Sequence, residues 1–244
     1  KGGILEARML VKKGVIEEPP NRPKFCYNLP LVKILKERCN IPIYMENDAN
    51  LAALGEYWQG LKDKPEILVV MTLGTGVGGG IIINGKIWNG ASGIAGEIGH
   101  IPIYNKGYKC GCGNIGCLET FASSTAVARM YKTKKKITKE ITAQKIYELA
   151  NKGNKEAQEI FTKVGKTLGK AIVILCHTMG PDQIIFTGGG AGAWDLFQKP
   201  MYDTINTMCF EKEKQVLKIS CSKLEGNSGI LGAAFFAWQN LGKM

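Results

Sequence analysis

The sequence predicts an α/β protein with mixed sheets, and two observations support this prediction. Stretches with apolar residues at helical spacing, such as Leu31–Cys39 and Lys155–Met179, alternate along the chain with short continuous apolar runs. Two of these runs, Ile67–Leu73 and Gln183–Thr187, end in glycine-rich segments. Short buried strands bounded by glycine and separated by helices are typical of α/β proteins.

The first part of the chain is expected to form helix, strand, turn and helix before a glycine-linked pair of strands. The expected segments, in order, are a helix at 31–39, a β-like run at 41–45 (IPIYM), a polar turn at 46–50 (ENDAN), a helix at 51–58, a strand at 67–73 and a strand at 81–83. The dipeptide Asn84-Gly85 favours a tight turn after the last of these strands.

The second part begins with a glycine-rich stretch and then alternates between helices and strands. The expected segments are a glycine-rich stretch at 86–119, helices at 141–150 and 155–179, a strand at 183–187, a helix at 194–209, a strand at 219–224 and an apolar helix at 229–241. Gly180-Pro181 marks the end of the long helix.

The composition excludes several classes of protein. The chain has 244 residues, 45% of them apolar and 22% charged, which is globular usage rather than that of disordered, collagen-like or membrane-spanning chains. No run approaches the roughly 18 apolar residues of a membrane span, and the start KGGILEAR has no secretory core. We expect a cytoplasmic protein with no membrane partner.

The positive charge is mostly lysine. The chain carries 32 Lys and Arg against 21 Asp and Glu, a formal net charge of +11, yet only four of the basic residues are Arg. Because bidentate reading of phosphates favours arginine, the charge argues only weakly for nucleic acid, and no nucleic-acid partner is expected. We interpret the densest run, KTKKKITK at residues 132–139, as a solvated loop.

Two glycine loops indicate a nucleotide. Gly74, Gly76 and Gly79 satisfy G-x-G-x-x-G, but a strand rather than a helix follows, so this is no Rossmann loop, and no Walker A sequence is present. The bare N–H groups of this loop and the Thr75 hydroxyl would wrap polyphosphate, although a structural hairpin remains the alternative. A second loop at 188–190 follows a strand and precedes a helix, where ligands commonly bind.

A cluster of cysteines predicts a metal site. Cys110, Cys112 and Cys117 lie within eight residues, and His100 lies ten residues before them. This Cys3His set suits a structural zinc ion, with reduced core cysteines as the alternative. His177 is expected in the core or at a helix end. The remaining cysteines are expected to be packing residues: Cys26, Cys39, Cys176, Cys209 and Cys221.

Three motifs in a fixed order resemble the ROK family of bacterial sugar kinases and sugar-responsive repressors. They are ENDAN at 46–50, LGTGVGGG at 73–80, and EIGH at 97–100 followed by CGCGNIGCLE at 110–119. The resemblance extends from about Gly14 to the C-terminus and includes PPN at 19–21 and the closing GNSGILGAA.

The resemblance implies an actin-like, hexokinase-type ATPase fold with two domains and a cleft between them. The implied domains are residues 1–48, the remainder of a small domain that is incomplete in this chain; residues 49–226, a large domain with the nucleotide and zinc sites; and residues 227–244, a helix that returns to the small domain. ATP, Mg²⁺ and Zn²⁺ are the implied cofactors, and a homo-oligomer, a dimer or tetramer, is the implied assembly.

The resemblance also implies roles for individual residues. Asp48 is the implied catalytic base, and Asn47, Glu97, His100 and Glu119 are the implied sugar contacts. The zinc ligands are His100, Cys110, Cys112 and Cys117, and the nucleotide contacts are Gly74, Thr75, Gly76, Gly78, Gly188, Gly189 and Gly190.

The chemistry of these side chains agrees with the implied roles. Phosphoryl transfer needs one carboxylate to take the proton of the attacking hydroxyl, and a helix N-terminus at Asp48 favours its ionised form. A plain helix N-cap is the alternative for Asp48, and surface salt bridges are the alternatives for Glu97 and Glu119. His100 would bind metal through one ring nitrogen and donate to the sugar through the other.

Two departures from the family pattern concern the start of the chain. The sequence holds no Asp-x-Gly-Gly-Thr phosphate loop, so a chain that truly starts at Lys1 should be inactive. LEARML at residues 5–10 also stands where the family has a Gly-x-Pro-Gly turn.

Three functions are therefore compared. The first is an ATP-dependent hexose kinase, with glucose as the favoured acceptor. The second is a sugar-sensing regulator whose DNA-binding region precedes Lys1. The third, a zinc-ribbon nucleic-acid module, is disfavoured by the single closed metal set and the scarcity of arginine.

Overall fold

The computed structural model describes residues 9–10, 14–16 and 28–242. The motif PPN, Cys26 and most of the LEARML stretch lie outside the described residues. The chain forms two compact units, one comprising Lys1–Val70, Gly79–Gly96 and Ser222–Met244, and the other Met71–Gly78 and Glu97–Cys221. The domain boundaries implied by the family resemblance stay a prediction.

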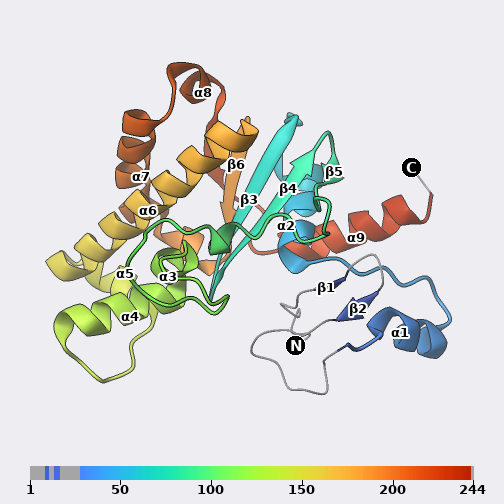
Figure 1. The fold of residues 1–244 in the computed structure, drawn as a ribbon, viewed down its shortest axis with the longest axis horizontal. Helices are drawn as coiled ribbons and strands as arrows, with labels where there is room; N and C mark the ends of the chain where they lie inside the picture. Colours follow the sequence, from blue (N-terminus) through green and yellow to red (C-terminus); the bar gives the residue numbers. More distant parts are fainter. Residues whose placement is uncertain (1–8, 11–13, 17–27, 243–244) are drawn as a thin grey trace. The chain divides into compact units, whose positions relative to one another are not determined.

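A five-stranded mixed sheet has the order β5-β4-β3-β6-β7 (Figure 1). Its strands are β3 (Ile67–Leu73), β4 (Val77–Ile83), β5 (Lys86–Ile87), β6 (Gln183–Thr187) and β7 (Lys218–Cys221). β4 and β5 pair antiparallel, whereas β6 and β7 pair parallel with Ile184 opposite Ile219. The predicted mixed sheet is confirmed, and the strand over 183–187 has the predicted bounds.

In the first unit, the C-terminal helix packs against the helix that begins within the ENDAN segment. Its elements are β1 (Met9–Leu10), β2 (Val15–Ile16), α1 (Leu31–Cys39), α2 (Asp48–Gly55), the π-helix η3 (Glu56–Gly60) and α9 (Ser228–Asn240). α9 packs on α2 and η3, and Trp58 stacks on Phe235 with ring centroids 4.9 Å apart. The buried carboxylate of Glu56 accepts from the hydroxyls of Ser222 and Ser228.

The predicted strand at residues 41–45 is wrong. This segment is not a strand in the structure, and Ile41 and Tyr44 are exposed. Pro42 has no N–H to donate to a strand ladder, which opposes regular pairing here. Cys39 is likewise exposed rather than packed, whereas Cys176 and Cys209 are buried as expected.

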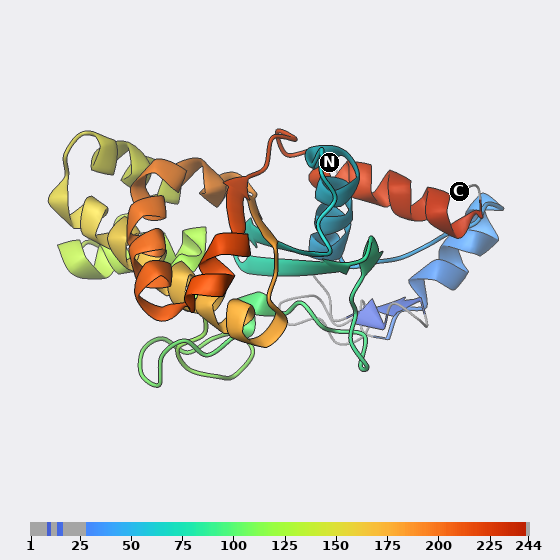
Figure 2. The ribbon, with the colours of Figure 1, turned by 90° about the horizontal axis from the view of Figure 1, so that it is seen from above.

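The second unit surrounds one long helix. Its helical elements are η4 (Ile98–His100), α3 (Glu119–Ala122), α4 (Ser124–Lys135), α5 (Ala143–Asn151), α6 (Lys155–Met179), η5 (Gly189–Ala193), α7 (Trp194–Met208) and α8 (Glu211–Val216). α6 runs beside α7 in both views (Figures 1 and 2). Asn154 caps α6 by accepting from the Ala157 N–H, and Gly180 ends it at φ +57°.

His177 lies at a helix end, one of its two predicted environments. It is in the last turn of α6 and its Nδ1 is 3.0 Å from Glu213 Oε1. The hydrogen bond with His177 is the main reason that the pKa of Glu213 lies below its usual range. No helix among the described residues combines the length and apolarity that a membrane crossing requires.

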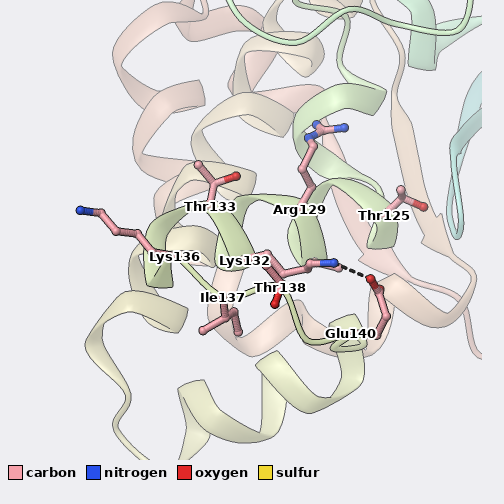
Figure 3. A pocket seen from close by; sticks show the side chains of 9 residues that line it. Thr125, Arg129, Lys132, Thr133, Lys136, Ile137, Thr138 and Glu140 are labelled. Atoms are coloured by element: carbon pink, nitrogen blue, oxygen red, sulfur yellow. Dashed lines mark hydrogen bonds and ion pairs between the residues drawn. The ribbon is translucent and has the colours of Figure 1, made fainter.

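The lysine run at 132–139 is only partly the predicted loop, because residues 132–135 form the last turn of α4. Lys132 and Lys136 border a pocket of about 790 Å³ between α4 and the segment up to Glu140 (Figure 3). Lys132 pairs with Glu140 at 2.5 Å, and Lys134 and Lys135 pair with glutamates of α6. Exposed pairs of this kind contribute little to stability, so the run behaves as a solvated face.

Candidate functional site

The ENDAN turn presents a carboxylate at the N-terminus of α2. Asn47 is the N-cap: its Oδ1 accepts from the N–H groups of Ala49 (2.8 Å) and Asn50 (3.2 Å). Asp48 is the first residue of the helix, its side chain is half-buried, and its Oδ1 accepts from the Ala49 N–H at 2.8 Å. The capping role that was the alternative for Asp48 thus falls to Asn47.

The loop between β3 and β4 is shorter than predicted and is held by α4. It comprises residues 74–76, and Gly78 lies within β4. The Ser124 N–H donates to Gly74 O at 2.8 Å, and the Thr125 hydroxyl donates to Thr75 O at 2.9 Å. These two bonds fix the loop backbone, while the Thr75 side chain stays exposed.

Glu119 is attached to the same loop. Its Oε2 accepts from the Val77 N–H at 3.1 Å, and a β-carbon on Gly76 would lie 2.3 Å from that oxygen. A side chain at Gly76 would therefore displace the Glu119 carboxylate from this position. Glu119 Oε1 lies 3.9 Å from Cys110 Sγ, so one carboxylate links the glycine loop to the cysteine cluster.

The second glycine loop meets the first at the end of β3. Gly188 has φ +84°, and a β-carbon there would lie 2.6 Å from Leu73 O, while one on Gly190 would lie 2.9 Å from Leu73 Cβ. Gly189 has no such neighbour within 4 Å. Two loops that are more than 100 residues apart in the sequence are thus brought together at the carboxyl ends of two neighbouring strands.

The four predicted metal ligands converge. The Sγ atoms of Cys110, Cys112 and Cys117 and a ring nitrogen of His100 all lie within 4.8 Å of one another. Cys112 and Cys117 sulfurs are 3.7 Å apart, and Cys110 Sγ is 3.4 Å from His100 Nδ1. Tetrahedral zinc bonds imply separations of about 3.8 Å between sulfurs and about 3.5 Å between sulfur and nitrogen. The donor set fits a closed zinc site.

His100 presents its two ring nitrogens to different neighbours. Nδ1 faces Cys110, whereas Nε2 is 3.7 Å from Glu97 Oε2. A metal on Nδ1 would leave the proton on Nε2, on the side of Glu97. Glu97 is exposed and precedes η4, so its carboxylate is accessible to a ligand.

Burial sets the protonation of the thiols. Burial raises the pKa of Cys117 to about 12 and also raises that of Cys110. Burial raises the pKa of Cys112 as well, but hydrogen bonds from Asn114 and the neighbouring thiols outweigh it, and the net pKa is lowered. A metal ion bound by Cys110 and Cys117 would therefore have to displace protons from both thiols.

An aromatic brace holds the cysteine loop against the helices of the second unit. The Arg129 guanidinium lies 3.9 Å from the Tyr108 ring centroid and donates to Thr120 O. Tyr104 packs edge-on against Phe121, with ring centroids 4.8 Å apart. These contacts could not be predicted from the sequence, because single aromatic residues in a glycine-rich stretch show no helical or strand periodicity.

The comparisons with known proteins agree with this geometry. The sequence profile of the ROK family matches residues 4–240, and the chain belongs to this family. It is 34% identical over 230 residues to a glucokinase of Halalkalibacterium halodurans, covering 89% of this chain and 70% of the relative. It is also 34% identical over 219 residues to a xylose repressor of Caldicellulosiruptor bescii, covering 84% of this chain and 54% of the repressor.

Solved structures give the same fold. The ROK hexokinase of Thermus thermophilus superimposes with a TM-score of 0.84 at 27% identity, covering 98% of this chain and 78% of the other. The ROK glucokinase of Streptomyces griseus, solved in complex with glucose and AMPPNP, gives a TM-score of 0.81 at 30% identity, covering 93% and 78%. The predicted family and the predicted actin-like ATPase fold are confirmed.

Proposed function

We propose that this chain forms the sugar- and nucleotide-binding part of an ATP-dependent hexose kinase that converts glucose to glucose 6-phosphate in the cytoplasm. The meeting of the loops 74–76 and 188–190 at Leu73 carries the proposal, because a sugar sensor has no need of two exposed main-chain surfaces for phosphates. The glucokinase relatives and the glucose complex of the S. griseus enzyme support the choice of acceptor.

In this proposal Asp48 is the general base. It takes the proton of the sugar 6-hydroxyl, whose oxygen forms a bond to the γ-phosphorus of ATP while the bond from that phosphorus to the bridging oxygen breaks and ADP leaves. The backbone amides of Thr75 and Gly76 and the 188–190 loop are proposed to face the phosphates, whereas the Gly74 N–H donates to Gly76 O at 3.0 Å and closes the turn. Because Oδ1 of Asn47 already caps α2, we assign the sugar contact of Asn47 to its Nδ2 group.

The acidic and histidine side chains are proposed to read the sugar hydroxyls. Glu97 accepts from one hydroxyl, and Glu119 accepts through Oε1, because its Oε2 is bound to Val77. His100, fixed through Nδ1 by a structural zinc ion, donates its Nε2–H. Mg²⁺ is expected to accompany ATP. We further propose a homo-oligomer, which light scattering would test.

The test uses the complete gene product, a panel of hexoses and a coupled assay for ADP. Asp48→Asn should lower kcat by about 10²–10⁴-fold while glucose affinity, measured by calorimetry, changes little. Asp63→Asn is the matched control, since Asp63 is exposed and remote in sequence from every proposed contact. Undiminished turnover in Asp48→Asn would refute the base, and absence of ADP release with every hexose would refute the kinase.

A sugar-sensing regulator is the second candidate, because repressors are among the relatives at 34% identity. This alternative expects sugar binding without turnover, together with DNA binding by the complete gene product that falls when sugar is added. Sugar-independent DNA binding that weakens steeply with salt would instead support a nucleic-acid module.

A further inference from the structure

Two buried side chains, Glu46 and Asn50, and the half-buried side chain of Asn89 form a closed ring of hydrogen bonds at the ENDAN turn. Asn50 Nδ2 donates to Glu46 Oε1 at 3.0 Å and to Asn89 Oδ1 at 2.8 Å. Asn89 Nδ2 completes the ring by donating to Glu46 Oε2 at 3.1 Å. Glu46 and Asn50 are only 7% and 4% exposed, so water does not compete strongly for these bonds.

The ring also defines which way each amide points. Both acceptors near Asn50 face its Nδ2 group, and therefore Oδ1 is the atom that remains buried without a partner. Asn89 must present Oδ1 to Asn50 and Nδ2 to Glu46. A reversed amide at either residue would place two donors or two acceptors against each other.

The ring is tied directly to the proposed sugar-binding turn. Glu46 Oε1 accepts from the Asn47 N–H at 2.8 Å, and Asn50 donates its own N–H to the Asn47 side chain. Three hydrogen bonds occupy most of the acceptor sites of the buried Glu46 carboxylate, so we interpret Glu46 as an anchor rather than as a second base.

Asn89 connects this anchor to a different segment of the chain. It follows β5, and its carbonyl accepts from the Ala95 N–H at 3.1 Å, which closes the loop that runs on to Gly96 and Glu97. Gly96 has φ +96°, and a β-carbon there would lie 2.9 Å from Gly79 O, so this loop is held closely at its far end as well.

We propose that Asn89 and Glu46 are positioning residues that hold the Asn47–Asp48 turn in the geometry needed to bind the sugar and deprotonate its hydroxyl. The inference rests on the proposed function. Neither residue touches the reacting atoms; both act through the backbone and the cap at Asn47. Because a displacement of about 1 Å at a reacting group can cost about 10²-fold in rate, loss of one ring bond should be visible in catalysis.

An isosteric exchange of charge and amide tests the ring. Asn89→Asp alone places a carboxylate against Glu46, and Glu46→Gln alone can place an amide N–H₂ against that of Asn89. In Glu46→Gln/Asn89→Asp, the new glutamine donates to the new aspartate, and every other ring bond is retained. We expect each single variant to lower kcat/KM for glucose at least tenfold and the double variant to recover to within about threefold of wild type.

Two further measurements separate positioning from stability. Asn206→Asp, on the exposed surface of α7, is the matched control for the added charge and should leave kinetics unchanged. In an Asp48→Asn background, Asn89→Asp should produce no further loss of kcat, because the geometry it disturbs serves the missing base. If Asn89 had a merely structural role, Asn89→Asp would lower kcat in the Asp48→Asn background by the same factor as in the wild type.

The outcomes distinguish this inference from the proposed function. Two results would overturn the inference and leave an active kinase in place. The first is single variants with wild-type kcat and KM. The second is a double variant whose kcat/KM falls by the product of the two factors measured for the single variants. If the wild-type gene product binds glucose without turnover, the two single variants and the double variant are compared by their glucose affinity instead of kcat/KM. A wild-type protein that neither binds nor phosphorylates any hexose would overturn both.

Discussion

The crossing of α2 and α9 brings two helix backbones into direct contact. A β-carbon on Gly232 would lie 1.7 Å from Leu51 O, and one on Gly55 would lie 2.0 Å from Ser228 O. Ordinary contact begins at 3.4 Å, and a backbone carbonyl cannot rotate away as a side chain can. The seating of α9 against the helix that begins at Asp48 therefore depends on these two glycines.

Gly232→Ala should accordingly destabilise the protein. In an unhindered helix, alanine is more stable than glycine by about 0.5–1 kcal/mol. Here the two helices would have to separate by more than 1 Å to accept the methyl group, and overpacking of this kind typically costs about 1–3 kcal/mol. The expected net effect is a loss of up to about 2.5 kcal/mol in the free energy of unfolding, which is the balance of these two contributions.

Gly229→Ala is the matched control, because it lies on the same helix and has no neighbour within 4 Å. It should leave stability unchanged or raise it by about 0.4–1 kcal/mol. Urea unfolding followed by circular dichroism measures both variants, and the midpoints should move in opposite directions. Equal midpoints for the two alanine variants would refute the close-contact reasoning.

Three other predictions concern the metal and nucleotide sites. Removal of zinc with a chelator should weaken glucose binding more than nucleotide binding, and equal glucose affinity with and without metal would contradict this. Because burial holds the pKa of Cys117 at about 12 and raises that of Cys110, both thiols bind protons that zinc must displace. Zinc affinity should therefore rise between about pH 6 and pH 8, by up to about tenfold per pH unit for each proton released. Competition with a zinc-binding dye measures this affinity, and an affinity independent of pH would refute the prediction. Gly76→Ala should weaken ATP binding by pushing Glu119 from its place, whereas Gly189→Ala, with open space around it, should weaken ATP binding less; the reverse order in calorimetry would argue against the loop geometry.

Local signals account for what the sequence analysis obtained. The bounds of α6 were predicted because its apolar spacing persists for 25 residues between an Asn cap and a glycine in the left-handed region. The candidate metal ligands could be recognised because three of them lie within one short loop whose glycines allow it to fold back: Gly113 and Gly116 both have positive φ. Each of these features is encoded within a few residues of where it acts.

The features that were missed depend on partners far away in the chain. Asn89 is an ordinary loop residue in the sequence, and its bond to Glu46 spans 43 positions. Glu56 is buried although it is charged, because hydroxyls 166 and 172 positions away bind its carboxylate. Hydrophobic spacing predicts only a continued helix over 51–58, whereas the chain forms the π-helix η3 from Glu56.

Glu119 changes how the two predicted sites should be understood. The sequence treats the glycine loop and the cysteine cluster as separate motifs, yet this carboxylate accepts from Val77 at one oxygen and lies 3.9 Å from Cys110 at the other. Loss of metal should therefore disturb the glycine loop to some extent. The loop keeps its bonds from Ser124 and Thr125, which involve no predicted metal ligand. The larger effect is therefore expected on the proposed sugar side, where the His100 ring contacts the cysteine cluster through Nδ1 and, at 3.7 Å, only the exposed carboxylate of Glu97 through Nε2.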